Sequence, residues 1–292
     1  MTQQLIFAAP GNEAIAAHLA GGADKLGQFE MRTFPDGETY LRFISDVNDR
    51  DVTLVCTLSD PNVHALEVMF FAATARELGA TRVGLVAPYL AYMRQDKRFH
   101  EGEAVTSRIF APFLSAHVDW LVTVDPHLHR YNSLDEIYTI PSHVAHAAGP
   151  IAAWIKANVA QPVLIGPDGE SEQWVKDVAA QAGAPFTVLT KIRHGDHDVE
   201  VSLPELDKYR HHTPVLVDDI ISTARTMIET VKHLTAMGTK PPVCIGVHGV
   251  FAGAAYTDLQ QSGVARIVTC NTIPHPSNGI DISGVLPAVP PA

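Results

Sequence analysis

The sequence has few cysteines, no long apolar run and few basic residues, and each of these shortages excludes a class of protein. Three cysteines in 292 residues are too few for the disulfide framework of a small secreted domain. No stretch approaches the about 18 apolar residues typical of a membrane span, and MTQQLIFAAPGNE has no basic residue before its short apolar run, so we expect no signal peptide. The 32 acidic residues outnumber the 21 basic ones, which gives a formal net charge of −11. This excess of negative charge disfavours nonspecific nucleic-acid binding. We therefore expect a globular protein of the cytoplasm, with neither membrane nor nucleic acid as partner.

The pattern that is present is an alternation of short apolar runs with helix-length amphipathic stretches. It predicts an α/β protein built of βαβ units, with mainly parallel sheets covered on both faces. Asn12 and Asn62 precede helical patterns and predict helix N-caps. Cys56, Cys244 and Cys270 lie in apolar runs and are expected in the core. Expected strands are 5–9, 52–57, 82–87, 120–124, 163–166, 186–189, 215–217, 243–247 and 266–269, and expected helices are 62–78, 106–116, 173–182, 226–237 and 253–260.

Two segments depart from this alternation. In residues 31–43, MRTFPDGETYLRF, a Pro-Asp-Gly turn between β-rich flanks predicts a hairpin or a bent excursion. Residues 191–203, KIRHGDHDVEVSL, place a charged stretch beside alternating valines, as in a flap or flexible loop. We expect a domain boundary near 141–150, where the pattern is interrupted, and a Pro-rich tail too short to form a domain.

The segment VLVDDIISTARTM, residues 215–227, carries the clearest chemical signal. An apolar strand leads into Asp218 and Asp219, and a hydroxyl-rich loop then opens a helix. Helix N-termini with hydroxyl side chains bind anions, and two carboxylates can accept hydrogen bonds from a vicinal diol. Together they would suit a ribose 5-phosphate at the carboxyl end of a strand. The alternative is an ordinary strand–turn–helix with Ser222 or Thr223 as the N-cap.

This segment resembles the phosphoribosyl-pyrophosphate (PRPP) loop shared by phosphoribosyltransferases and PRPP synthetases. Further motifs resemble the synthetases: an ATP-site hairpin, an Arg-Gln-Asp segment with its following helix, an Asp-x-His motif, a Pro-Asp segment and the Lys-x-Arg of a catalytic flexible loop. In this sequence they read FPDGE (34–38), PYLAYMRQDKRFHEGEAVTSRIFAPFL (88–114), VDPHLH (124–129), GPDGES (166–171) and KIR (191–193). The motifs run in order over nearly the whole chain, which is identified as a member of the ribose-phosphate pyrophosphokinase family.

The resemblance implies two tandem phosphoribosyltransferase-like domains, 1–144 and 145–275, and a tail, 276–292, packed on the first. It implies transfer of the diphosphoryl group of ATP to the 1-hydroxyl of ribose 5-phosphate, with Mg²⁺, in a homo-oligomer whose adenine sites are shared between subunits. The implied catalytic residues are Lys191 and Arg193, and the metal ligands are His127 and Asp168. ATP is assigned to Phe34, Asp36, Glu38, Arg94, Gln95 and Asp96, and ribose 5-phosphate to Asp218, Asp219, Ser222, Thr223, Ala224, Arg225 and Thr226.

Some residues depart from the family pattern. Ser222 stands for the common Asp and Arg225 for the common Gly of the phosphate loop, and Ile192 replaces one cation of a Lys-Arg-Arg run. His129 forms His-x-His with His127, a spacing that can bind a transition metal, but with 15 histidines in the chain we treat it as an ordinary residue. Two alternatives stay open: a catalytically silent regulatory homologue and a phosphoribosyltransferase. The presence of the Lys-x-Arg and hairpin motifs favours an active synthetase.

Overall fold

The computed structural model describes residues 4–166, 171–188, 190–194, 198–202 and 206–290. For residues 190–194, 198–202, 206 and 207 it describes the backbone only. The chain divides into two compact units: unit 1 comprises Met1–Ala145 with Ser283–Ala292, and unit 2 comprises His146–Ile282. Each unit is an α/β domain, as the alternating pattern predicts.

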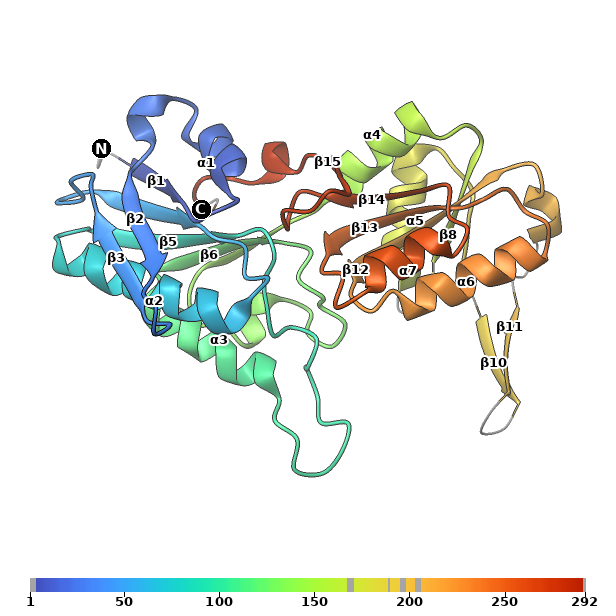
Figure 1. The fold of residues 1–292 in the computed structure, drawn as a ribbon, viewed down its shortest axis with the longest axis horizontal. Helices are drawn as coiled ribbons and strands as arrows, with labels where there is room; N and C mark the ends of the chain where they lie inside the picture. The colour runs from blue at the N-terminus through green and yellow to red at the C-terminus, as the bar shows by residue number, and fades with distance from the viewer. Residues whose placement is uncertain (1–3, 167–170, 189, 195–197, 203–205, 291–292) are drawn as a thin grey trace. The chain divides into compact units, whose positions relative to one another are not determined.

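Unit 1 is built on a parallel five-stranded sheet with the order β1-β4-β5-β6-β7. Figure 1 shows α2 and α3 side by side on one face of this sheet and α1 on the other. Every residue of β6 is buried, as expected for a central strand covered on both faces. The strands are β1 (Gln4–Ala8), β4 (Asp51–Val55), β5 (Arg82–Ala87), β6 (Trp120–Val124) and β7 (Ser142–Ala145), and the helices are α1 (Glu13–Ala20), α2 (Pro61–Glu77) and α3 (Thr106–His117).

The predicted hairpin is confirmed as β2 (Phe29–Thr33) and β3 (Thr39–Phe43), paired antiparallel. Gly37, at φ 95°, supplies the left-handed residue that the tight turn needs. The base of the hairpin is anchored on the core of unit 1: the ring centroids of Phe43 and Phe71 lie 4.8 Å apart, and those of Phe7 and Phe43 lie 5.3 Å apart. The tip, with Phe34, remains exposed.

Unit 2 contains a parallel six-stranded sheet with the order β15-β14-β13-β12-β8-β9. Helices α4 and α5 pack against each other, as do α6 and α7. A second hairpin, β10 with β11, projects from the rest of this unit (Figure 1). The strands are β8 (Pro162–Gly166), β9 (Phe186–Val188), β10 (Thr190–His194), β11 (Asp198–Ser202), β12 (Thr213–Ile221), β13 (Val243–Gly249), β14 (Arg266–Cys270) and β15 (Asn278–Ile280), and the helices are α4 (Ala148–Asn158), α5 (Glu172–Ala182), α6 (Arg225–Ala236) and α7 (Ala255–Gln261).

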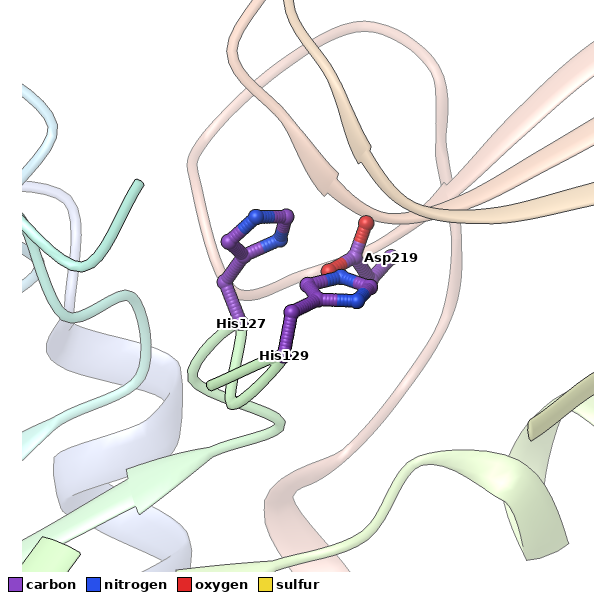
Figure 2. A group of neighbouring side chains, drawn as sticks. All are labelled: His127, His129 and Asp219. Carbon is purple, nitrogen blue, oxygen red and sulfur yellow. The ribbon is translucent and has the colours of Figure 1, made fainter. Parts of the chain in front are cut away.

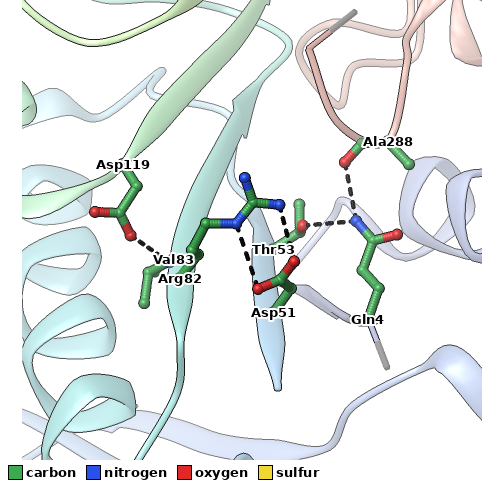
Figure 3. A network of polar contacts seen from close by, with 7 residues as sticks. All are labelled: Gln4, Asp51, Thr53, Arg82, Val83, Asp119 and Ala288. Carbon is green, nitrogen blue, oxygen red and sulfur yellow. Dashed lines mark hydrogen bonds and ion pairs between the residues drawn. The ribbon is translucent and has the colours of Figure 1, made fainter. Parts of the chain in front are cut away.

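The end of the chain is shared between the units rather than packing as one tail from residue 276. Asn278–Ile280 forms β15 of the unit 2 sheet, because its backbone pairs with β14. From Ser283 onward the chain belongs to unit 1. There the Nε2 of Gln4 donates to the carbonyl of Ala288 at 3.1 Å and to the hydroxyl of Thr53 at 3.2 Å. Figure 3 shows this attachment beside the Arg82–Asp51 ion pair, which joins β5 to β4.

Several local expectations needed correction. Asn12 is the N-cap of α1, but its side chain accepts from the backbone and hydroxyl of Thr57 instead of from the helix. Asn62 is not an N-cap, because Pro61 opens α2 and Asp60 occupies the cap. The segment 191–203, for which a flap or flexible loop was expected, includes most of the described β10–β11 hairpin, an arrangement compatible with a flap. The three cysteines are buried, as predicted.

Candidate active site

The candidate ribose 5-phosphate residues follow the carboxyl-end half of β12 in unit 2. The strand does not end before the two acids, as the apolar run suggested, but continues to Ile221. Its pairing with β8 stops at Leu216, so Asp218 and Asp219 extend past that neighbour. Their carboxylates are half-buried, and each accepts a hydrogen bond from the backbone N–H of the next residue, at 3.0 and 2.7 Å. These bonds hold two anionic groups in fixed positions at the carboxyl edge of the sheet, where ligands bind in such folds.

The loop after β12 turns at Ala224, which is buried and lies at φ 56°. It is the N-cap of α6, and no side chain makes the capping hydrogen bond, so neither Ser222 nor Thr223 is a cap. The carbonyls of Ile221 and Ser222 accept from the backbone N–H groups of Phe251 and Ala252, both at 3.0 Å, and these bonds fix the start of the loop. The first N–H groups of a 12-residue helix thus face the loop without intrahelical partners. This geometry suits an anion.

Arg225 replaces a glycine of the family pattern without backbone strain. The left-handed residue of the loop is Ala224, whereas Arg225 is already the first residue of α6. Its side chain is exposed, and Ser222 and Thr226 are half-buried. The backbone conformation of the loop therefore requires no glycine at position 225.

In unit 1 the Arg-Gln-Asp segment follows β5, and the Asp-x-His motif follows the neighbouring strand β6. Parallel neighbours end at the same edge of a sheet, so both motifs lie at its carboxyl edge. Asp96 is buried, and its carboxylate lies 3.3 Å from the guanidinium of Arg130. Gln95 is half-buried and Arg94 exposed.

Three residues that sequence reasoning missed hold this segment in place. Ser107 binds the carbonyl of Gln95 through its backbone N–H at 3.4 Å and through its hydroxyl at 3.2 Å. The buried hydroxyl of Tyr131 lies 2.9 Å from that of Ser107 and 3.4 Å from the carbonyl of Asp96. Arg130 is the third. Arg130 and Tyr131 directly follow the VDPHLH motif, and no periodicity in the sequence marks them.

The tip of the β2–β3 hairpin presents Phe34, Asp36 and Glu38, all exposed. The Phe34 N–H donates to the Glu38 carbonyl at 2.7 Å, which closes the turn. The guanidinium of Arg32 lies over the ring of Phe34 at 4.6 Å and over the ring of Tyr40 at 4.4 Å. This cation–π contact orients Phe34 while leaving the ring accessible to a planar ligand.

His127 and His129 lie on the loop after β6, and Figure 2 shows their rings side by side. The ring centroids are 4.0 Å apart. Asp125 and His127 are both in the left-handed region, at φ 33° and 25°, and the His127 N–H donates to the Asp125 carbonyl at 2.9 Å. Such conformations cost free energy in non-glycine residues and are concentrated at functional sites. Asp219, the third residue drawn in Figure 2, belongs to unit 2.

The remaining candidates are described only in part. Asp168 lies outside the described residues. Lys191 and Arg193 lie in β10, opposite Val201 and Val199 of β11, and the structure describes their backbone alone. The two cationic positions are therefore carried by the projecting hairpin of unit 2 (Figure 1).

The two parallel α/β units, with the acidic end of β12 and the loop that follows it, have the architecture of phosphoribosyltransferase-like domains. A model described as the N-terminal domain of ribose phosphate pyrophosphokinase matches residues 5–117, and the phosphoribosyl transferase domain model matches residues 133–283. The ribose-phosphate pyrophosphokinase of Sulfurisphaera tokodaii is 31% identical, over 89% of this chain and 89% of its own. That of Saccharolobus solfataricus is 32% identical, over 85% of each. The chain belongs to the ribose-phosphate pyrophosphokinase family.

A solved structure of the same family agrees on the fold. The phosphoribosylpyrophosphate synthetase of Mycobacterium smegmatis superposes with a TM-score of 0.79 at 23% identity, covering 94% of this chain and 90% of that one. Among the described residues, no helix is both long and apolar enough to cross a bilayer.

Proposed function

We propose that this chain transfers the β,γ-diphosphoryl group of ATP to the 1-hydroxyl of ribose 5-phosphate, producing PRPP and AMP. The observation that carries the proposal is the β12–loop–α6 segment. Two half-buried carboxylates, Asp218 and Asp219, suit the sugar diol, and the α6 N-terminus with Ser222, Thr223 and Thr226 suits the 5-phosphate. The proposed transfer does not require a covalent enzyme intermediate.

In the proposed step the 1-hydroxyl oxygen attacks the β-phosphorus of ATP. The bond between that phosphorus and the oxygen bridging to the α-phosphorus breaks, AMP leaves, and the hydroxyl proton passes to water. Negative charge accumulates on the phosphoryl oxygens, so positioned cations supply most of the catalysis. We propose that Lys191 and Arg193, on the hairpin that projects from unit 2, are these cations.

A divalent metal fits the residues of the VDPHLH loop. His127 is half-buried on a turn held by the Asp125 carbonyl, and we assign it with Asp168 as the Mg²⁺ ligands. Mg²⁺ commonly takes one or two protein ligands together with substrate phosphates and water, which agrees with a small ligand set. When bound, Mg²⁺ would neutralise charge on the ATP phosphates.

We assign ATP binding to the Arg-Gln-Asp segment, which follows β5 in unit 1, and to the tip of the β2–β3 hairpin. Gln95 and Asp96 are fixed by hydrogen bonds, so the segment is ordered before a ligand arrives. Phe34, oriented by Arg32, can stack on adenine, and the carboxylates of Asp36 and Glu38 can accept its exocyclic amine. The side chain of Arg94 is exposed and available to the phosphates.

We further propose a homo-oligomer of at least two chains, with the hairpin of one subunit completing the ATP site of another. Val63, Leu66 and Phe70 form an exposed apolar stripe at helical spacing along α2, which a subunit interface would cover. Mixing an Asp36-defective chain with an Arg94-defective chain should restore activity, since one mixed interface holds an intact site. Inactive mixtures of chains that demonstrably exchange subunits would contradict the shared site.

The deciding assay measures AMP release from ATP with and without ribose 5-phosphate, and identifies PRPP as the second product. AMP formation that requires ribose 5-phosphate supports the proposal. A protein that binds ATP without releasing AMP would be a silent homologue, and one that consumes PRPP in the presence of a nucleobase would be a phosphoribosyltransferase.

A further inference from the structure

The loop after β6 contains a feature that the proposed reaction does not use. His129 has no assigned role there, yet its ring centroid lies 4.0 Å from that of His127. One nitrogen of each ring lies within 4.8 Å of the other. Two nitrogens bound to one tetrahedral ion are about 3.4 Å apart, given metal–nitrogen bonds of about 2.0–2.1 Å. The pair is therefore close to ligating distance, and the side chain of His129 is exposed.

The loop presents both rings on one side for a structural reason. Leu128, between them, packs against the hydrophobic core of unit 1 and anchors the loop there. Pro126 and the left-handed residues Asp125 and His127 restrict the turn. Figure 2 shows the two imidazoles rising together from this loop. A preorganised pair loses little conformational entropy when it binds an ion.

We propose that His127 and His129 form a two-imidazole site for a first-row divalent transition metal such as Ni²⁺, Co²⁺ or Zn²⁺. Imidazole nitrogen suits these ions, whereas Mg²⁺ prefers oxygen ligands. The second histidine therefore selects for a class of metal that a single histidine with carboxylates and phosphates would not favour. This proposal rests on the proposed function, in which His127 is a ligand of Mg²⁺.

The test is a calorimetric titration of the full-length protein with Ni²⁺, without nucleotide or sugar phosphate, so that it is independent of catalysis. The wild type should bind one Ni²⁺ tightly, and His129→Ala should weaken that binding at least tenfold, since loss of even an outer-shell partner of a metal ligand typically costs 10–100-fold. His127→Ala should have a similar effect. His211→Ala is the matched control, because His211 is also exposed and also has a second histidine, His212, close by in sequence. Its Ni²⁺ affinity should stay within twofold of the wild type.

A His129→Ala protein that binds Ni²⁺ as tightly as the wild type would overturn the proposal, and so would displacement of Ni²⁺ by equimolar Mg²⁺. Visible absorption of bound Co²⁺ provides a second readout. Its bands should be altered in His129→Ala and unchanged in His211→Ala. The AMP-release assay tests the proposed function separately, so a failed titration with intact AMP release refutes the imidazole pair alone.

Discussion

Tyr131→Phe tests whether the hydrogen bonds behind the Arg-Gln-Asp segment contribute to ATP binding. The change removes one hydroxyl and keeps the ring. That hydroxyl lies 2.9 Å from the hydroxyl of Ser107 and 3.4 Å from both the Asp96 carbonyl and the Nε of Arg108. Ser107 retains its bond to the Gln95 carbonyl at 3.2 Å, so no new unsatisfied group is created there. We expect a loss of about 1 kcal/mol in the free energy of unfolding. If the lost 1 kcal/mol is lost entirely from the ordering of the Arg-Gln-Asp segment, the KM for ATP rises about fivefold.

The matched control is Tyr138→Phe. Tyr138 is equally buried, but its hydroxyl has no hydrogen-bond partner among the described residues. Burial raises the pKa of Tyr138, so the hydroxyl is neutral at all working pH values. Its removal should leave the KM for ATP unchanged and the stability equal or higher.

The assays are chemical denaturation and steady-state kinetics with varied ATP at saturating ribose 5-phosphate. Equal stability losses in the two variants would refute the hydrogen-bond reasoning. A stability loss in Tyr131→Phe with the KM for ATP within about 1.5-fold of wild type would show that these hydrogen bonds do not contribute to ATP binding.

Three further outcomes follow from the proposed site and from one ion pair outside it. Lys191→Ala should lower kcat and kcat/KM together, by about a hundredfold, because its charge is expected to act in the transition state; a raised KM at normal kcat would make it a ground-state contact. Arg225→Ala should raise the KM for ribose 5-phosphate roughly tenfold, about 1.4 kcal/mol, and leave that for ATP unchanged; a change under twofold would mean that Arg225 faces solvent only. The Glu67 carboxylate, hydrogen-bonded to the imidazole at 2.6 Å, raises the pKa of His64, so the stabilisation is complete below the unfolded pKa and is lost as pH rises through the folded one. His64→Gln should therefore lower the melting temperature at pH 5.5 and not at pH 9, and equal shifts at both would refute the ion pair.

The strands and helices that sequence reasoning found are those that bury a periodic apolar face. Strands 82–87 and 120–124 match β5 and β6 to the residue, because their apolar runs are long and end at clear breaks. The strand β7 escaped notice because it is a four-residue edge strand, and edge strands need fewer apolar residues. Helix α4 was missed because Gly149 and Pro150 read as a break. Both lie in its first turn, where proline needs no N–H partner.

Some parts of the candidate site could be predicted from the sequence and others could not. The motifs are contiguous in sequence: Asp218 to Thr226 suggested a ribose 5-phosphate site from residue type and spacing, whereas the FPDGE turn predicted only a tight turn, and its ATP role came from the resemblance to the family. The contacts that hold the Arg-Gln-Asp segment could not be predicted, because they join residues far apart in sequence: Tyr131 contacts Ser107, and Arg130 pairs with Asp96. The proximity of the two histidines also required the turn at Asp125 to be seen.

One short stretch of unit 1 serves two parts of the proposed site. Residues 127–129 carry the imidazole pair, and the next two residues, Arg130 and Tyr131, hold Asp96 and Gln95 through an ion pair and through Ser107. A substitution that shifts this stretch therefore displaces the metal ligands and the ATP segment together, and its kinetic effects cannot be divided between them. Tyr131→Phe keeps both members of the Arg130–Asp96 pair, whereas His129→Ala removes the ring that lies beside His127. Used together, these two variants separate the effect on ATP from the effect on the metal, which neither activity measurement alone would do.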